Sequence, residues 1–192
     1  MADQFSFPGL EPAPQVDSLF FAVLPNVEAA ARLSELRARI AGRHSLGGSP
    51  VTADRLHVTL KLVGNYAGLP ASAVEAAKLA ASTVSVAPFA ITFSHVTSFG
   101  GGAMVLRGGE GTDELVALGD AIGVAMIKAG LKPASGQSKT PHMTLLYDRA
   151  STVPEEPVEP LRWTAREFVL IHSRVGLTDH KALARWPLLP NA

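Results

Sequence analysis

Two segments of the chain share the pattern His-X-Thr-Leu, and the sequence before each follows the same order. HVTL occupies residues 57–60 and HMTL occupies residues 142–145. An apolar run, a stretch with helical spacing and a polar loop precede each one. The separation from Leu19 to His57 is 38 residues and that from Val105 to His142 is 37. We interpret this match as an internal duplication.

Hydrophobic periodicity predicts the elements of both repeats and of the segments around them. Strands are expected at 19–24, 55–64, 88–97, 103–107, 140–148, 162–175 and 181–188, and helices at 27–41, 71–83 and 113–128. Asn26 and Thr112 are the expected N-caps, and residues 150–160, with three prolines, are expected to form a loop. We predict an α+β fold in which duplicated β-α-β units form two lobes about a pseudo-twofold axis, with antiparallel sheets around a central groove.

The composition limits the class of protein. Hydrophobic residues make up 47% of the chain and charged residues 18%, which is typical of a globular domain. We expect a tail at 1–17 and a single bilobal domain at 18–192. Because 17 basic residues balance 17 acidic ones, no large positive field is available for long nucleic acids. The absence of cysteine, of a leader-like start and of a long apolar run predicts a cytoplasmic protein that does not insert in a membrane, and we expect a monomer.

Each motif places a histidine beside a threonine. In a strand, residues i and i+2 project from one face, so His57 lies beside Thr59 and His142 beside Thr144. By the same parity Lys61 shares the face of His57. Two imidazoles can supply a general base and a general acid, and two hydroxyls can bind the oxygens of a phosphate. This chemistry needs no metal or cofactor. The alternative is a pair of core histidines.

A third His-X-Thr element, at His95 and Thr97, is followed by Ser98 and has no counterpart in the other repeat. We therefore interpret His95 as a structural histidine. The remaining histidines, at 44, 172 and 180, lack further ligands at metal-binding spacing.

The segments LFFAVLP near the start, LHVTLKLVG and PHMTLLYD together resemble the two-histidine phosphoesterases, and within them the 2′-5′ RNA ligase or RNA 2′,3′-cyclic phosphodiesterase branch. The resemblance runs from about Leu19 to the final strand. It implies a bilobal α+β fold, cleavage of RNA 2′,3′-cyclic phosphates to 2′-phosphates and, in some members, reversible 2′-5′ joining of RNA ends. By this likeness His57 is the general acid and His142 the general base.

The resemblance also implies an arginine five residues after the second histidine, where this chain has Tyr147. Arg107 and Arg149 are candidates to replace it, and we favour Arg107. Lys61 is a further candidate phosphate contact. Aromatic candidates for stacking on a terminal base are Phe21, Phe99 and Tyr147.

We therefore expect a phosphoric diester hydrolase that acts on RNA ends or nucleoside 2′,3′-cyclic phosphates. Two alternatives remain open. One is a 2′-5′ RNA ligase or 2′-5′ oligonucleotide phosphodiesterase that uses the same groups. The other is a noncatalytic nucleotide-binding module on the same fold.

Overall fold

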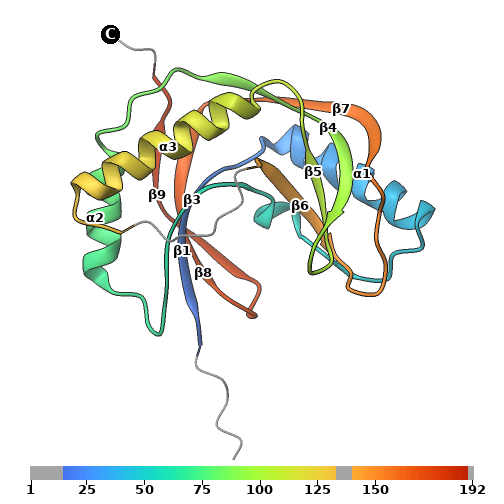
Figure 1. Cartoon of the computed structure of the whole chain (residues 1–192), viewed down its shortest axis with the longest axis horizontal. Coiled ribbons are helices and arrows are strands. Elements are labelled where there is room, and N and C mark those ends of the chain that lie inside the picture. Colours follow the sequence, from blue (N-terminus) through green and yellow to red (C-terminus); the bar gives the residue numbers. More distant parts are fainter. Residues whose placement is uncertain (1–14, 133–139, 190–192) are drawn as a thin grey trace, which may run out of the picture.

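The computed structural model describes residues 15–132 and 140–189, and its strands form a single antiparallel sheet (Figure 1). The strands are β1 (Asp17–Val23), β2 (Ser49–Pro50), β3 (Val58–Tyr66), β4 (Phe89–Phe99), β5 (Ala103–Arg107), β6 (His142–Tyr147), β7 (Glu156–Ala165), β8 (Glu167–Arg174) and β9 (Asp179–Pro187). The helices are α1 (Val27–Arg43), the 3-10 helix η1 (Ala53–Arg55), α2 (Ala71–Ala81) and α3 (Thr112–Lys128). Most of the tail expected at 1–17 lies outside the described residues, but Asp17 already belongs to β1.

The strand order shows the duplication directly. It runs β7-β4-β5-β6-β3-β1-β8-β9, and β2 is added beside β6. The four strands on one side of the β6–β3 boundary mirror the four on the other, with β5 equivalent to β1 and β6 to β3. At the boundary, β3 and β6 pair only through Val58 and Met143. The α+β fold with antiparallel sheets that the sequence predicts is therefore observed.

The helix of each repeat covers the sheet of the other repeat. Helix α1 follows β1 but packs on β6 and β7, whereas α3 follows β5 but packs on β3 and α2 (Figure 1). A Cβ atom added to Gly119 of α3 would lie 2.7 Å from the Leu60 carbonyl oxygen of β3, which shows how closely that helix approaches the strand. The buried side chains beneath the helices consequently form one continuous cluster across both repeats.

The ends of the helices follow from local chemistry. The Asn26 side chain accepts a hydrogen bond of 2.8 Å from the Ala29 amide, as the sequence predicts for an N-cap. The expectation for Thr112 is wrong, because Gly111 is the N-cap, at a positive φ of 84°. An added Cβ on Gly111 would lie 2.0 Å from the Ala90 carbonyl oxygen, so both the backbone angle and the space require glycine.

The segment after β6 contains one more strand than the sequence predicts. Residues 150–160 are only partly a loop, because β7 begins at Glu156 despite its prolines. Strand β7 lies at the edge of the sheet, which is where strands tolerate proline. The interval 162–175 therefore includes the end of β7 and the whole of β8, two strands that lie in different halves of the sheet. The short strand β2 was not predicted, and two residues carry too little periodicity to reveal it.

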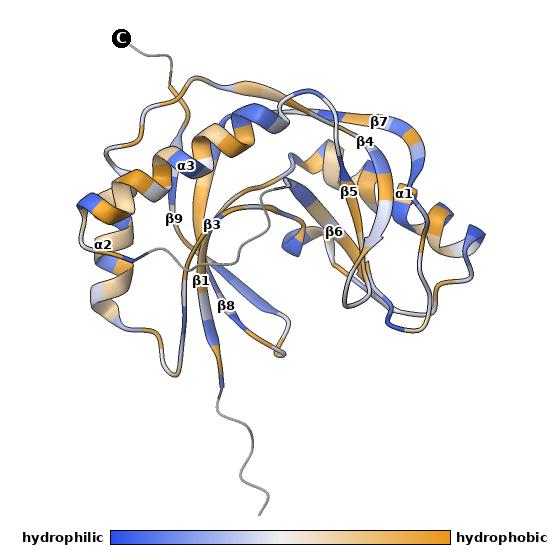
Figure 2. Ribbon diagram, viewed as in Figure 1, coloured by the Kyte–Doolittle hydropathy of each residue, from blue (hydrophilic) through white to orange (hydrophobic). Residues whose placement is uncertain are grey.

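The strands differ in hydropathy along their length. In Figure 2 the lower ends of β1 and β8 are hydrophilic, whereas the strands further up are largely hydrophobic. A second, smaller cluster of Phe20, Ala22, Val169 and Ile171 lies apart from the main core, with Leu62 packed against it. This smaller cluster supports the wall of the site described next.

Candidate active site

The two His-X-Thr motifs meet at the boundary between the repeats. Val58 and Met143, the residues between histidine and threonine in each motif, are the pair that joins β3 to β6. Continuing this antiparallel register by one residue in each direction places His57 opposite Thr144 and Thr59 opposite His142. The pseudo-twofold axis thus brings together two imidazoles and two hydroxyls, as the sequence predicts.

Both imidazoles are held in the same way. The His57 Nδ1 atom lies 2.7 Å from the Arg55 carbonyl oxygen, and the His142 Nδ1 atom lies 2.9 Å from the Thr140 carbonyl oxygen. A carbonyl oxygen only accepts, so each Nδ1 carries the proton and donates. In the neutral ring Nε2 is then the basic nitrogen, and neither Nε2 atom has a hydrogen-bond partner among the described residues. This arrangement leaves both Nε2 atoms available for proton transfer.

A pocket of about 350 Å³ opens beside the motifs. Its described lining consists of Ser18, Phe20, Val51, Arg55, His57, Thr59, Leu62, Thr144, Tyr147, Ser173, Val175 and His180. The volume suits a nucleotide-sized ligand. Three of the four predicted catalytic residues therefore line one cavity, and the fourth, His142, lies close enough to His57 to act on its pKa.

A bulge after each threonine changes which side chains face the pocket. Thr59 pairs with Ala22 and Lys61 pairs with Phe21, so Leu60 is an extra residue without a partner. The prediction that Lys61 shares the face of His57 is therefore wrong. Lys61 runs along α3 instead, where a Cβ atom added to Gly123 would lie 2.9 Å from its Cε. Leu62 takes the place in the pocket that simple alternation assigned to Lys61.

The predicted aromatic contacts have different outcomes. Phe21 is fully buried and packs against Phe168 and Trp186, with ring centroids 6.1 and 6.0 Å away, so it belongs to the core. Its neighbour Phe20 faces the pocket instead, 5.1 Å from the His57 ring. Phe99 lies edge-on to the His142 ring at 4.8 Å.

Tyr147 lines the pocket, and its side chain is half-exposed. It therefore stays a candidate for contact with a ligand, as does Phe99.

Arg107 lies directly opposite His142 on the neighbouring strand. Its guanidinium forms an ion pair with Glu155, and Arg107 does not line the pocket.

His95 is opposite Arg107 on the other side, and its Nδ1 atom lies 3.0 Å from the Ser94 hydroxyl. His95 is also absent from the pocket lining, which agrees with its interpretation as a structural residue.

Among the pocket residues with a charged or titratable side chain, sequence reasoning missed Arg55 and His180. The sequence carries no signal that places His180 at the site, because His180 lies on the last strand, β9, next to the β8–β9 turn. The His180 ring centroid lies 5.3 Å from that of His57 and 5.9 Å from that of Phe20. Burial, followed by the positive charges of His57 and Arg55, lowers the pKa of His180 to about 4. His180 is therefore a neutral group at physiological pH.

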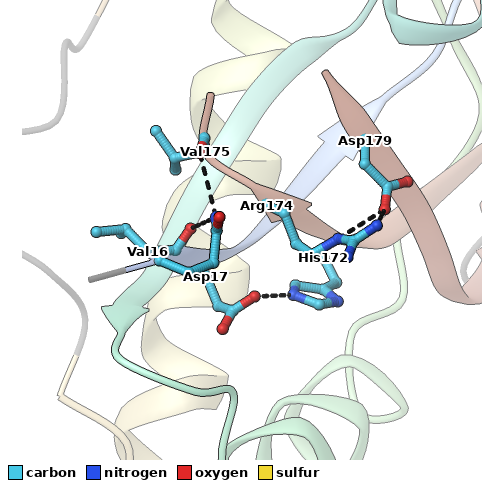
Figure 3. A network of polar contacts seen from close by, with 7 residues as sticks. Val16, Asp17, His172, Arg174, Val175 and Asp179 are labelled. Carbon is cyan, nitrogen blue, oxygen red and sulfur yellow. Dashed lines mark hydrogen bonds and ion pairs between the residues drawn. The ribbon is translucent and has the colours of Figure 1, made fainter. Parts of the chain in front are cut away.

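The β8–β9 hairpin, which carries His180 on β9, is attached to the start of β1. The Val175 amide donates to the Val16 carbonyl at 2.9 Å, and the Gln15 side chain donates to the Val175 carbonyl at 3.1 Å. Figure 3 shows this contact together with the Arg174–Asp179 ion pair across the hairpin and the His172–Asp17 pair beside it. These bonds fix the hairpin over the pocket.

The environment of His57 disfavours its charged form. Burial lowers the pKa of His57 most, and the nearby charges of Arg55 and His142 lower it further, against the opposing effect of the hydrogen bond to the Arg55 carbonyl. His57 is consequently neutral over more of the pH range than a free histidine.

No metal-binding group emerges from the part of the chain that the structure describes. Within residues 15–132 and 140–189, no cluster of three or more His, Asp or Glu side chains could hold a metal ion. Every helix in these ranges is too short or too polar to span a bilayer.

Comparison with solved structures finds the same fold in several proteins. E. coli LigT in complex with 3′-AMP superposes with a TM-score of 0.70 and 25% identity, over 90% of this chain and 98% of that one. A structure described as a phosphoesterase gives 0.71 and 26% identity over 91% and 98%. The protein TT0787 of Thermus thermophilus gives 0.65 and 22% over 89% and 97%, a likeness of fold alone. No protein of curated function matches the sequence.

The family model for the 2′-5′ RNA ligase superfamily matches residues 25–177, which include both His-X-Thr motifs and the strands that join the repeats. Because this match covers most of the chain and the fold agrees over nine-tenths of it, the chain belongs to the 2′-5′ RNA ligase superfamily of two-histidine phosphoesterases.

Proposed function

We propose that this protein hydrolyses 2′,3′-cyclic phosphates at RNA ends to 2′-phosphates, with His57 and His142 as the acid/base pair. The observation that carries the proposal is the Val58–Met143 pairing, which puts each histidine opposite the threonine of the other motif. LigT, which shares the fold, has been solved with 3′-AMP, so a structural relative binds a nucleotide with a phosphate on the ribose.

In the proposed reaction His142 Nε2 removes a proton from a water molecule as the water oxygen attacks phosphorus. The bond between phosphorus and the ribose 3′ oxygen breaks, and His57 donates a proton to that oxygen. The Thr59 and Thr144 hydroxyls donate hydrogen bonds to the nonbridging oxygens, where negative charge is concentrated. One proton is taken up and one is released, so no other reactant is needed.

His57 can act as the acid only in its protonated form. A bound phosphate places a negative charge beside the ring and raises its pKa, which offsets the effect of burial in the empty site. We therefore assign the acid to His57 and the base to His142, as the family resemblance implies. The pH dependence described in the Discussion tests this assignment.

The superfamily's description favours 2′-5′ joining as a second activity. It would use the same groups in the same direction, with the 5′-hydroxyl of a second RNA end attacking phosphorus in place of water and the ribose 3′ oxygen leaving. The balance between the two depends on whether a second RNA end reaches the pocket.

The decisive experiment is incubation of a short RNA bearing a 2′,3′-cyclic phosphate with the protein in EDTA, with the product identified by mass spectrometry and phosphatase sensitivity. We expect a 2′-phosphate. His57→Ala and His142→Ala should each reduce kcat by about 10²- to 10⁴-fold, the usual contribution of a general acid or base. His95→Ala, a matched change outside the pocket, should retain most activity.

A 2′-5′-linked product would favour ligation. Binding of the RNA without turnover would favour a noncatalytic module. Activity that is lost in EDTA and restored by a divalent metal would contradict the mechanism.

A further inference from the structure

We propose that Arg55 is the cation that binds the substrate phosphate in this pocket. The inference rests on the proposed function in one respect, that the pocket binds a phosphate group. Its support comes from the position, charge and unpaired state of the Arg55 side chain.

The substrate brings a negative charge into a pocket whose described lining carries one permanent positive charge. Among the described lining residues, Arg55 is the only lysine or arginine, and no aspartate or glutamate is present. His180, with its pKa of about 4, stays neutral at physiological pH. Arg55 is therefore the only described lining side chain that remains cationic across the whole physiological range.

The Arg55 guanidinium has no carboxylate partner among the described residues, since none of the ion pairs there includes it and its Nε atom is buried without a hydrogen-bond partner. The Nε atom of Arg107 is also buried without a hydrogen-bond partner, but Glu155 already neutralises the charge of Arg107. A buried, unpaired donor on a cation is costly, and an anionic ligand with acceptor oxygens removes that cost.

The charge of Arg55 also reaches the reacting groups. It acts on the pKa of both His57 and His180, which places the guanidinium near both rings. The Arg55 carbonyl accepts the hydrogen bond from His57 Nδ1 at 2.7 Å. The residue therefore orients the imidazole through its backbone and, in our proposal, holds the phosphate through its side chain.

The test compares Arg55→Gln and Arg55→Lys with Arg107→Gln, which removes the same charge from β5, opposite His142 but outside the pocket lining. Binding of 2′-AMP is measured by calorimetry, with adenosine as the phosphate-free control. Arg55→Gln should weaken 2′-AMP binding by about 10- to 100-fold, the usual loss for a charged hydrogen bond, and leave adenosine binding unchanged. Arg55→Lys should fall between Arg55→Gln and the wild type, because lysine keeps the charge but loses the two-pronged geometry.

Arg107→Gln should change 2′-AMP binding less than Arg55→Gln does. An NMR titration supplies an independent readout, since loss of the Arg55 charge should move the His57 pKa upward even without turnover.

Unchanged 2′-AMP binding in folded Arg55→Gln, or a larger loss in Arg107→Gln, would overturn the proposal. So would failure of the wild type to bind 2′-AMP at all. If the wild type binds 2′-AMP but does not open cyclic phosphates, the proposed reaction fails while the role of Arg55 is still decided by these variants.

Discussion

Leu60 and Leu145 occupy the same place in the two repeats, since each is the extra residue of a bulge directly after the motif threonine. On one side Thr59 and Lys61 pair with consecutive residues of β1, and on the other Thr144 and Leu146 pair with consecutive residues of β5. A bulge re-aims the side chains that follow it. Both bulges turn the fifth residue after the histidine toward the pocket, which makes Leu62 and Tyr147 equivalent wall residues.

Because Tyr147 is a wall residue of the pocket, Tyr147→Arg should change substrate binding. The new guanidinium would lie in the wall of the pocket and attract the anionic substrate, so we expect KM for a 2′,3′-cyclic nucleotide to fall several-fold with little change in kcat. Tyr147→Phe is the matched control and should have little effect, because it keeps the ring. Steady-state kinetics at low ionic strength measures both. An unchanged KM in Tyr147→Arg would show that this wall does not approach the phosphate.

Each repeat's helix packs on the sheet of the other repeat, and glycine substitutions in the two helices should have opposite effects on stability. Gly119→Ala forces a Cβ against the Leu60 carbonyl, so it should lower the free energy of unfolding by about 1–3 kcal/mol. Gly42→Ala in α1 meets nothing within 4 Å and should raise it by about 0.5–1 kcal/mol. Urea titrations of both variants decide the matter. Equal stabilisation by both would mean that α3 does not press on β3.

The Asp17–His172 pair beside the pocket should contribute to stability. Asp17 is 8% exposed, and its carboxylate lies 2.6 Å from His172 Nε2 (Figure 3). His172→Leu leaves this carboxylate buried without its partner, so we expect a loss of about 1–3 kcal/mol in guanidinium unfolding. Asp17→Leu combined with His172→Leu should recover part of that loss, because no polar group is then left unpaired. A double variant as unstable as the sum of the single changes would argue against the pairing.

The sequence predicts most of the elements because their signals are local. A short apolar run ended by two glycines gives β5 with the bounds that the structure has, and Asn26 marks the start of α1. The duplication makes the two motifs equivalent, and they meet because their strands β3 and β6 are the ones that flank the boundary between the repeats.

The errors in the predicted site arise where the direction or position of a side chain depends on a strand distant in the sequence. Alternation assigns Lys61 to the pocket, but the bulge at Leu60 depends on the register with β1. The sequence makes Phe21 a candidate only because it is aromatic, and its neighbour Phe20 faces the pocket instead. Nothing in the spacing says that α3 covers the other repeat, because the same apolar stripe would fit either sheet. His180 reaches His57 only because the β8–β9 hairpin folds over the pocket.

The lowered pKa of His57 predicts the pH dependence of the reaction. A free histidine titrates near 6.5, and burial together with Arg55 and His142 moves His57 below that value. The two histidines titrate as a coupled pair, and the lower of the pair's two apparent pKa values sets the acidic limb of kcat/KM whichever histidine is the base. We therefore expect a bell whose acidic limb lies below about 6.5. Arg55→Gln removes one of the charges that lower the pKa and should move this limb upward. A profile that is flat between about pH 5 and 9, with chemistry rate-limiting, would mean that the histidines only position the phosphate.

The roles of the two histidines follow from the limb that each variant loses. With His57 as the acid, the residual activity of His57→Ala no longer depends on a proton donor, so its basic limb should disappear and its acidic limb should remain. His142→Ala should show the reverse. Because the bound phosphate raises the pKa of His57, the limbs of kcat should also lie at higher pH than those of kcat/KM. If His57→Ala instead loses the acidic limb, His57 is the base, which its neutral state in the empty pocket would favour.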